Sequence, residues 1–323
     1  MKQNAHMNIP KVQLGLYPTP LQELININRV LGNGKRIFLK REDLCGIGFG
    51  GNKIRRFEYL FAEALTQNCD CIVVGGGTQS NQTIAAAACA NKLGLTAHLI
   101  IPANAGSTVR RLAEIFGATL HEVDSAAELN KGVRATAMAL REQGNKPYTI
   151  LPGASTVLGV LGYVDAMQEL YAQADAAGLR IDHVVCCGGT GNTYAGVVLG
   201  TKLYSPSTKA TVISIGRRFC HKKTICDMAH KAAALIGSDI DVIESDLHVH
   251  FSCGKGLGAE TPKGKASMAQ MASLEGVFLD PVYTGKAFAG VLELNKTGIF
   301  LPGQTIVFIH TGGTVSLFSS FEK

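Results

Sequence analysis

Residues 71–101 read CIVVGGGTQSNQTIAAAACANKLGLTAHLII, and the order of residue types in this stretch decides the fold class. The apolar, β-branched run Cys71–Val74 predicts a strand, and Gly75–Gly77 follows it as a turn. An alanine-rich helix is expected over about 80–93, and a second strand over Ala97–Ile101. A strand, a crossover helix and a strand form a right-handed unit with parallel strands, so the stretch predicts an α/β protein.

The same alternation of short apolar runs and longer helical patterns continues on both sides of this stretch. Further strands are expected at Arg36–Lys40, Thr119–Val123, His183–Cys187, Thr211–Ile215 and Thr305–His310. Further helices are expected at Lys53–Gln67, Ser107–Phe116 and Thr193–Leu203. The pattern predicts two α/β units with parallel-rich sheets flanked by helices, meeting near Pro152–Gly162 and near Cys45–Gly51.

Composition narrows the class of protein. The 323 residues fit two domains or one large one. Apolar residues make up 46% and charged residues 17%, which excludes disorder of the whole chain. The 31 Lys and Arg exceed the 25 Asp and Glu by six, basic runs are short, and Trp is absent. A small anionic ligand is therefore favoured over a nucleic acid, which needs extended basic surface or stacking aromatics.

The nine cysteines include no C-x-x-C pair, and an odd number argues against a secreted disulfide framework. The spacing of Cys220, His221 and Cys226 matches no common zinc pattern, so ordinary thiols and no metal are expected. The N-terminal MKQNAHMNIPKVQLG holds no apolar signal segment, and Thr83–Ile101 is interrupted by polar residues at 91, 92 and 98. We expect a cytoplasmic protein without a membrane partner.

Four glycine-bearing segments stand where strands end or helices begin, which is where open parallel sheets bind ligands. In the first, Gly50-Gly51-Asn52-Lys53-Ile54-Arg55-Arg56, a lysine lies in the first turn of the expected helix. The helix dipole disfavours a cation there and lowers the pKa of the lysine, as a nucleophilic amine requires. A solvated surface lysine beside two arginines fits the same pattern.

The second segment runs from Gly75 to Gln82 and joins a strand to a helix. Ser80 can cap that helix, so that the backbone amides of Asn81 and Gln82 point outward at an anion such as a carboxylate. Plain helix capping explains these residues equally well.

The third segment, Cys187-Gly188-Gly189-Thr190-Gly191-Asn192-Thr193, has glycines that let the backbone approach a phosphate, which amides and hydroxyls then bind. A dinucleotide fingerprint would need a glycine where Tyr194 stands. No acidic residue follows the next strand, which disfavours NAD. Arg217 and Arg218 keep an NADP-dependent reductase open as an alternative.

The fourth segment, His310-Thr311-Gly312-Gly313-Thr314, places a hydroxyl after a strand, where it can face a ring nitrogen. A nucleophilic lysine, an anion site, a phosphate cup and this turn are together the parts that a pyridoxal 5′-phosphate (PLP) site requires.

Longer motifs connect these segments. They are Pro18-Thr19-Pro20-Leu21, Lys40-Arg41-Glu42-Asp43, Gly50–Arg56, Gln79–Gln82, Leu158-Gly159…Leu161-Gly162-Tyr163, Ser273-Leu274-Glu275-Gly276, Leu279–Lys286 and His310–Gly313. With these motifs, over nearly its whole length, the chain resembles the D-cysteine desulfhydrase and 1-aminocyclopropane-1-carboxylate (ACC) deaminase family. That family consists of PLP enzymes with the tryptophan-synthase-β-like fold.

The resemblance implies roles for individual residues. Catalysis would involve Lys53, which bonds the cofactor and carries a proton, together with Ser80 and Tyr283. The cofactor would be bound by Lys53, Asn81, Gly188, Gly189, Thr190, Gly191, Asn192, Thr193 and Thr311. A small amino-acid substrate would contact Ser80, Asn81, Gln82, Tyr283 and Lys255. The resemblance also implies a small α/β domain at 48–166 inserted into a large PLP-binding domain at 1–47 and 167–323, and a homodimer.

Two departures from the family pattern bear on the reaction. The deaminase branch has Glu after the tyrosine of the D-P-V-Y motif, where this chain has Thr284. A carboxylate there would keep the ring nitrogen of the cofactor protonated, so Thr284, with Thr311 facing that nitrogen, indicates a weaker electron sink. The second departure is Lys255, in Cys253-Gly254-Lys255-Gly256, where the family has a tyrosine. A lysine pointing into the site would favour an acidic β-substituent, whereas one pointing outward would leave the substrate unaffected.

The resulting expectation is a PLP-dependent lyase, similar to D-cysteine desulfhydrase, that performs α,β-elimination on a small amino acid. The products would be pyruvate, ammonia and a leaving group such as sulfide. ACC deaminase and an L-cysteate-type sulfo-lyase remain as alternatives. From other classes, an NADP-dependent reductase and a non-catalytic PLP or amino-acid binding protein remain open.

Overall fold

The structure is a computed structural model that describes residues 9–32, 34–153, 155–216, 221–252, 254–256 and 258–320. One sheet is formed by β1 (Leu21–Glu23), β2 (Arg36–Lys40), β7 (His183–Gly188), β8 (Lys209–Ser214), β9 (His248–Phe251) and β10 (Thr305–Ile309). The other is formed by β3 (Cys71–Gly75), β4 (Thr96–Pro102), β5 (Thr119–Val123) and β6 (Pro147–Ile150). The strand orders are β1-β2-β10-β7-β8-β9 and β5-β4-β3-β6, and only the β1–β2 pair is antiparallel.

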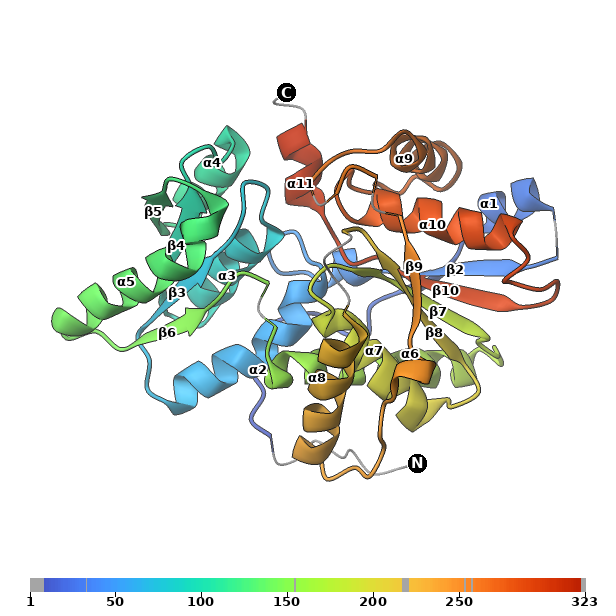
Figure 1. Cartoon of the computed structure of the whole chain (residues 1–323), viewed down its shortest axis with the longest axis horizontal. Coiled ribbons are helices and arrows are strands. Elements are labelled where there is room, and N and C mark those ends of the chain that lie inside the picture. Colours follow the sequence, from blue (N-terminus) through green and yellow to red (C-terminus); the bar gives the residue numbers. More distant parts are fainter. Residues whose placement is uncertain are drawn as a thin grey trace.

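Helices surround both sheets, which lie side by side (Figure 1). They are α1 (Ile25–Leu31), α2 (Asn52–Thr66), α3 (Asn81–Lys92), α4 (Ser107–Ile115), α5 (Leu129–Glu142), α6 (Val157–Ala176), α7 (Asn192–Tyr204), α8 (Lys222–Leu235), α9 (Pro262–Glu275), α10 (Thr284–Lys296) and α11 (Thr314–Ser319). Short 3-10 helices lie at Glu42–Leu44, Ala126–Glu128 and Glu244–Asp246. Within the described ranges, no helix is long and apolar enough to cross a membrane.

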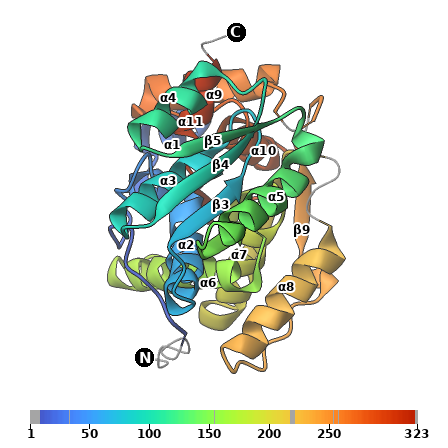
Figure 2. The same cartoon turned by 90° about the vertical axis from the view of Figure 1, so that its left-hand side faces the viewer.

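The parallel-rich α/β architecture expected from the sequence is confirmed. Each strand and helix predicted above is present, with its ends within two residues of the expected positions. In the four-stranded sheet, α5 covers one face while α3 and α4 cover the other (Figure 2). This arrangement follows from the strand pattern, because alternate residues of β4 pack against opposite helical layers.

The connectivity of the two sheets bears on the proposed insertion at 48–166. The four-stranded sheet uses only chain between residues 71 and 150, whereas the six-stranded sheet takes strands from both sides of it. The boundary at 166 falls inside α6, whose residues from Val160 onward pack in the core of the six-stranded sheet. A boundary just before α6 fits these contacts better.

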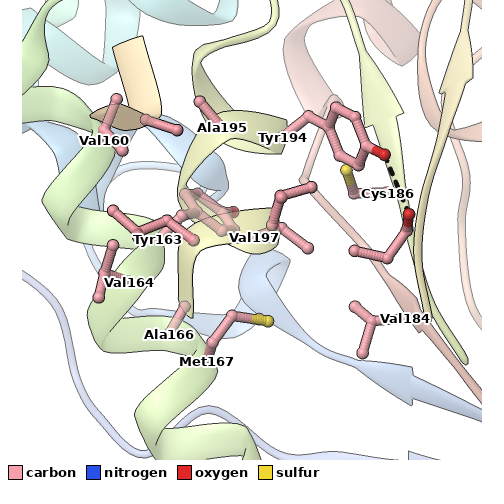
Figure 3. Packing of buried hydrophobic residues seen from close by; sticks show 14 of the residues in the cluster. Val160, Tyr163, Val164, Ala166, Met167, Val184, Cys186, Tyr194, Ala195 and Val197 are labelled. Atoms are coloured by element: carbon pink, nitrogen blue, oxygen red, sulfur yellow. Dashed lines mark hydrogen bonds between the residues drawn. The ribbon is translucent and has the colours of Figure 1, made fainter. Parts of the chain in front are cut away.

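Helix α6 fixes the positions of two neighbouring helices, α7 and α2. Residues of α6 such as Tyr163 pack against α7, and α7 packs in turn against β7 (Figure 3). A Cβ at Gly196 of α7 would lie 2.5 Å from the Cβ of Tyr163, and one at Gly162 of α6 would lie 2.4 Å from the carbonyl oxygen of Arg55 in α2. The two glycines therefore permit close helix packing, which fixes the starts of α2 and α7 relative to each other.

Candidate functional site

A cavity of about 610 Å³ lies at the carboxyl ends of the strands, where loops from the two sheets meet. All four glycine-bearing segments identified in the sequence contribute to its wall. The expected site residues that line it are Lys53, Ser80, Asn81, Gln82, Gly188, Gly189, Thr190, Gly191, Asn192, Thr193, Tyr283 and Thr311. These residues come from five separate parts of the chain, so tertiary structure assembles them at the place that parallel sheets use for ligands.

Lys53 is the second residue of α2, and two glycines shape the turn that leads into it. Gly50 and Gly51 have φ values of +64° and +99°. A Cβ at these positions would lie 2.2 Å from the carbonyl oxygen of Asp43 and 2.8 Å from that of Thr311. Only glycine fits such a turn, because side chains are disfavoured at positive φ and backbone lies in the way.

The amine of Lys53 has the electrostatic character that a nucleophile needs. Burial, together with the nearby charge of Arg56, lowers the pKa of Lys53 from 10.5 to about 7. The position of Lys53 in the sequence predicted a lowered pKa on the ground of the helix dipole, whereas desolvation is the larger cause. The Nζ atom lies 3.4 Å from Oδ1 of Asn52, at the long end of hydrogen bonding.

Ser80 is the N-cap of α3, and its Oγ accepts a hydrogen bond from the backbone N–H of Thr83 at 3.3 Å. Nε2 of Gln82 donates to the carbonyl oxygens of Gly75 (3.1 Å) and Leu151 (3.0 Å). Nδ2 of Asn81 donates to Oγ of Ser316 in α11 at 3.2 Å. Because both side-chain amide nitrogens already have partners, the backbone N–H groups of the first turn of α3 are the better donors for a substrate carboxylate.

The turn between β7 and α7 has the features of a phosphate cup. The N-cap of α7 is Gly191, at φ +94°, and none of the side chains that the structure describes caps the helix. A Cβ added at Gly189 would meet no atom of the described residues within 4 Å, so the backbone has open space on that side within this part of the structure. Oγ1 of Thr193 accepts a hydrogen bond of 3.0 Å from Nδ2 of Asn52, which joins the cup to the residue before Lys53. A helix N-terminus without a side-chain cap among the described residues, preceded by an open glycine, fits a phosphate group.

Arg56, which the sequence argument did not single out, supplies a cation to the same cavity. Its guanidinium is buried and lines the wall, and its Nη2 donates to the carbonyl oxygen of Gly153 at 2.6 Å. Burial lowers the pKa of Arg56 to about 10, so the group stays charged at neutral pH. No Asp or Glu is among the described residues that line the cavity. The Arg55-Arg56 doublet was the only sequence signal, and it did not reveal which arginine faces the cavity.

Tyr283 lines the cavity beside Val282, and burial, with a contribution from Asp280, raises its pKa, so its hydroxyl stays protonated at neutral pH. Thr284 is buried outside the lining. Its Oγ1 donates to Oδ1 of Asp280 at 2.7 Å and accepts from the backbone N–H of Asp280 at 2.9 Å. Thr311 lines the cavity from the segment that follows β10. In the part of the cavity near Thr311, a threonine hydroxyl rather than a carboxylate is therefore the polar group available to a ligand.

Lys255 is exposed and is not among the residues that line the cavity. Of the two orientations that the sequence left open, this one points the side chain toward solvent. Arg217 and Arg218, on which the NADP alternative depended, lie outside the described residues, as do Cys220 and Cys253.

The fold and the site together define an α/β enzyme that binds an aldehyde cofactor bearing a phosphate. A lysine of lowered pKa, an uncapped helix start, a buried guanidinium and a threonine hydroxyl fit the aldehyde, phosphate and ring nitrogen of PLP. The chain belongs to the family described as pyridoxal-phosphate-dependent enzymes, which it matches over residues 12–312, and it is PLP-dependent.

Individual relatives agree with this family. The chain is 37% identical over 322 residues to a putative ACC deaminase of Pyrococcus abyssi, covering 97% of this chain and 94% of the relative. It is 33% identical over 321 residues to a D-cysteine desulfhydrase of Salmonella choleraesuis, covering 96% of each. The crystal structure of an ACC deaminase homologue superposes with a TM-score of 0.90 at 33% identity, covering 98% of this chain and 96% of the other. An O-ureido-L-serine synthase shares the fold, with a TM-score of 0.69 at 15% identity over 94% of this chain and 91% of the other.

Proposed function

We propose that this enzyme catalyses α,β-elimination on a small amino acid, as a D-cysteine desulfhydrase does, and releases pyruvate, ammonia and a leaving group such as sulfide. The observation that carries the proposal is the chemistry of the cavity wall near Thr311. Thr284 has its hydroxyl bonded to Asp280, and no described lining residue is acidic. When bound, PLP withdraws electrons from the substrate α-carbon. A hydroxyl partner for its ring nitrogen suits a substrate whose β-substituent departs readily.

The residues of the chain divide the remaining work. Nζ of Lys53 holds the cofactor and, once released, takes the proton from the substrate α-carbon, for which a pKa near 7 is suited. The backbone N–H groups at the start of α3 bind the substrate carboxylate, and Ser80 shapes that turn. The start of α7 and the guanidinium of Arg56 hold the phosphate. The protonated hydroxyl of Tyr283 donates a hydrogen bond within the substrate pocket.

A product assay on purified holoenzyme tests the proposal. D-cysteine, L-cysteate, β-chloroalanine and ACC are supplied separately, and pyruvate, 2-oxobutyrate and sulfide are measured, with Lys53→Ala as the inactive control. We expect pyruvate from at least one substrate that has a β-leaving group, at a higher kcat/KM than 2-oxobutyrate from ACC. A higher kcat/KM for ACC would refute the elimination proposal and establish the deaminase alternative, which the name of the Pyrococcus abyssi relative favours. No turnover of any substrate would favour a binding protein.

We also infer from the family resemblance that the enzyme is a cytoplasmic homodimer. In the described part of the chain the cysteines form no disulfide, as is usual in a reducing compartment; they are Cys45, Cys69, Cys71, Cys89, Cys186, Cys187 and Cys226. Sedimentation equilibrium of the holoenzyme tests the dimer, and a mass of one chain would refute it.

A further inference from the structure

His310 is buried directly after β10, and its ring joins two segments of the cavity wall. Nδ1 accepts a hydrogen bond of 3.2 Å from the backbone N–H of Gly312, and Nε2 lies 2.8 Å from the carbonyl oxygen of Phe278. A carbonyl oxygen can only accept and a backbone N–H can only donate, so these two partners assign the proton to Nε2. The ring therefore uses both of its nitrogens and has one defined orientation.

Each hydrogen bond of His310 ends on a segment that carries a proposed ligand contact. Gly312 lines the cavity and directly follows Thr311. Phe278 begins the short segment that leads to Tyr283 at the start of α10. The ring of His310 is not part of the lining, so the residue acts on the site through these neighbours.

A second point of contact holds the same two segments together. The carboxylate of Asp280 accepts hydrogen bonds from the backbone N–H groups of Val282 (2.9 Å) and Tyr283 (2.8 Å). Gly313 packs so closely on that carboxylate that a Cβ would lie 2.3 Å from Oδ1. The segment that leads to Tyr283 and the segment that follows Thr311 are therefore in direct contact. A displacement of Phe278 or Gly312 would be transmitted to both of them, because closely packed groups cannot move independently.

The segment that carries Lys53 is connected to this junction as well. The backbone N–H of Asn52 donates to the carbonyl oxygen of Thr311 at 3.0 Å. Asp43, whose carbonyl oxygen lies against Gly50, places its Oδ1 3.8 Å from Nδ1 of His310. His310 thus lies where the segments bearing Lys53, Thr311 and Tyr283 converge.

We propose that His310 is a positioning residue that sets the relative placement of Thr311, Tyr283 and Lys53 around the cofactor. The roles of Tyr283 and Thr311 in this inference rest on the proposed function. The position of the bound cofactor, however, can be measured without any substrate.

Two near-isosteric variants separate the two hydrogen bonds. His310→Asn keeps an acceptor near Gly312 but loses the donor to Phe278, so it should mainly disturb the Tyr283 side. We expect kcat to fall about 10- to 100-fold, with PLP affinity changed less than threefold, since misplacement by about 1 Å costs about 10²-fold. His310→Gln keeps a donor that reaches Phe278 but loses the acceptor, so it should weaken PLP binding about tenfold or more and change the visible circular dichroism of the bound cofactor.

His183 provides the matched control. It is buried at the opposite end of the same sheet, in β7, with Nε2 3.2 Å from Oε1 of Gln304 and its ring edge-on to Phe300. His183→Gln should lower the melting temperature about as much as the two His310 variants do. It should leave PLP affinity, the dichroism band and kcat within twofold of wild type.

The proposal is overturned if both His310 variants lose only thermal stability, as the His183 variant does, with PLP affinity and dichroism unchanged. PLP affinity and dichroism of the substrate-free holoenzyme remain decisive even if the elimination assay of the wild type fails. A failure of the proposed function is therefore distinguishable from a failure of this inference.

Discussion

Lys53 leads to a quantitative prediction about cofactor capture. Only the neutral amine attacks an aldehyde, and an ordinary lysine with a pKa of 10.5 is neutral in about one molecule in 3,000 at pH 7. With a pKa of about 7, half of the Lys53 side chains are neutral at that pH. Ionisation alone should therefore make Lys53 about 10³ times more available than a free lysine at pH 7.

The assay mixes apoenzyme with PLP between pH 5.5 and 10 and follows the visible absorbance, with N-acetyl-lysine as a parallel reference for the ionisation of PLP itself. Because the reactive form is deprotonated, the rate should rise with pH, pass its midpoint near 7 and level off above about 8. Borohydride followed by peptide mapping should locate the reduced bond at Lys53. Lys53→Ala should fold and retain PLP non-covalently, without a reducible bond and without elimination.

Arg56→Gln provides an internal check, because the charge of Arg56 contributes to the lowered pKa. At saturating PLP, the midpoint of the variant should move to higher pH. A wild-type midpoint near that of N-acetyl-lysine would refute the electrostatic reasoning. A reducible bond mapped to another lysine, such as the buried Lys40 or Lys286, would refute the assignment itself.

Three further predictions concern Ser80, Lys255 and Glu42. Ser80→Ala should lower kcat/KM about 10- to 100-fold with PLP loading almost unchanged. Thr261 caps α9 and is not among the described residues that line the cavity, so Thr261→Ala should cost similar stability but leave kcat/KM unchanged. Equal kinetics of the two variants would reduce Ser80 to a cap. Lys255→Tyr should leave the ratio of D-cysteine to L-cysteate turnover within about twofold, because the lysine is exposed outside the cavity; a tenfold change, about 1.4 kcal/mol, would contradict that position. Glu42→Gln should destabilise the protein by roughly 1–3 kcal/mol in urea unfolding, because it removes the charge of one of the two carboxylates that pair with the buried Arg55, at 2.5 Å, and leaves Glu169 as the other. A loss under about 0.5 kcal/mol would contradict this. Although burial opposes it, the charge of Arg55 lowers the pKa of Glu42, so this contribution should be complete above pH 4.5 and be lost as pH falls through the lowered value.

The fold class and the outline of the site follow from local patterns in the amino-acid sequence. Strand and turn signals are local, so runs such as Cys71–Val74 followed by three glycines identify a strand end without knowledge of the rest of the chain. Parallel strands bring their carboxyl ends to one edge of a sheet, so ligand-binding segments could be expected there. Ser80 follows a strand of one sheet and the Gly188 turn ends a strand of the other, so the packing of the two sheets is what brings them together. The helix α6 was missed because its first eight residues, VLGVLGYV, include no charged or amide side chain and so lack the polar face by which a helical pattern is recognised.

Which charged residues belong to the cavity depends on how distant segments pack together. Arg55 and Arg56 are neighbours in sequence, yet Arg55 pairs with Glu42 and with Glu169, 114 residues away, while Arg56 lines the cavity. Lys255 lies outside the cavity. Its exposure could not be predicted from the sequence, because burial depends on which distant segments pack over a residue. The lowered pKa of Lys53 and the two bonds of His310 also depend on contacts between segments far apart in the chain. Local sequence carries the backbone pattern, but desolvation and pairing are properties of the assembled fold.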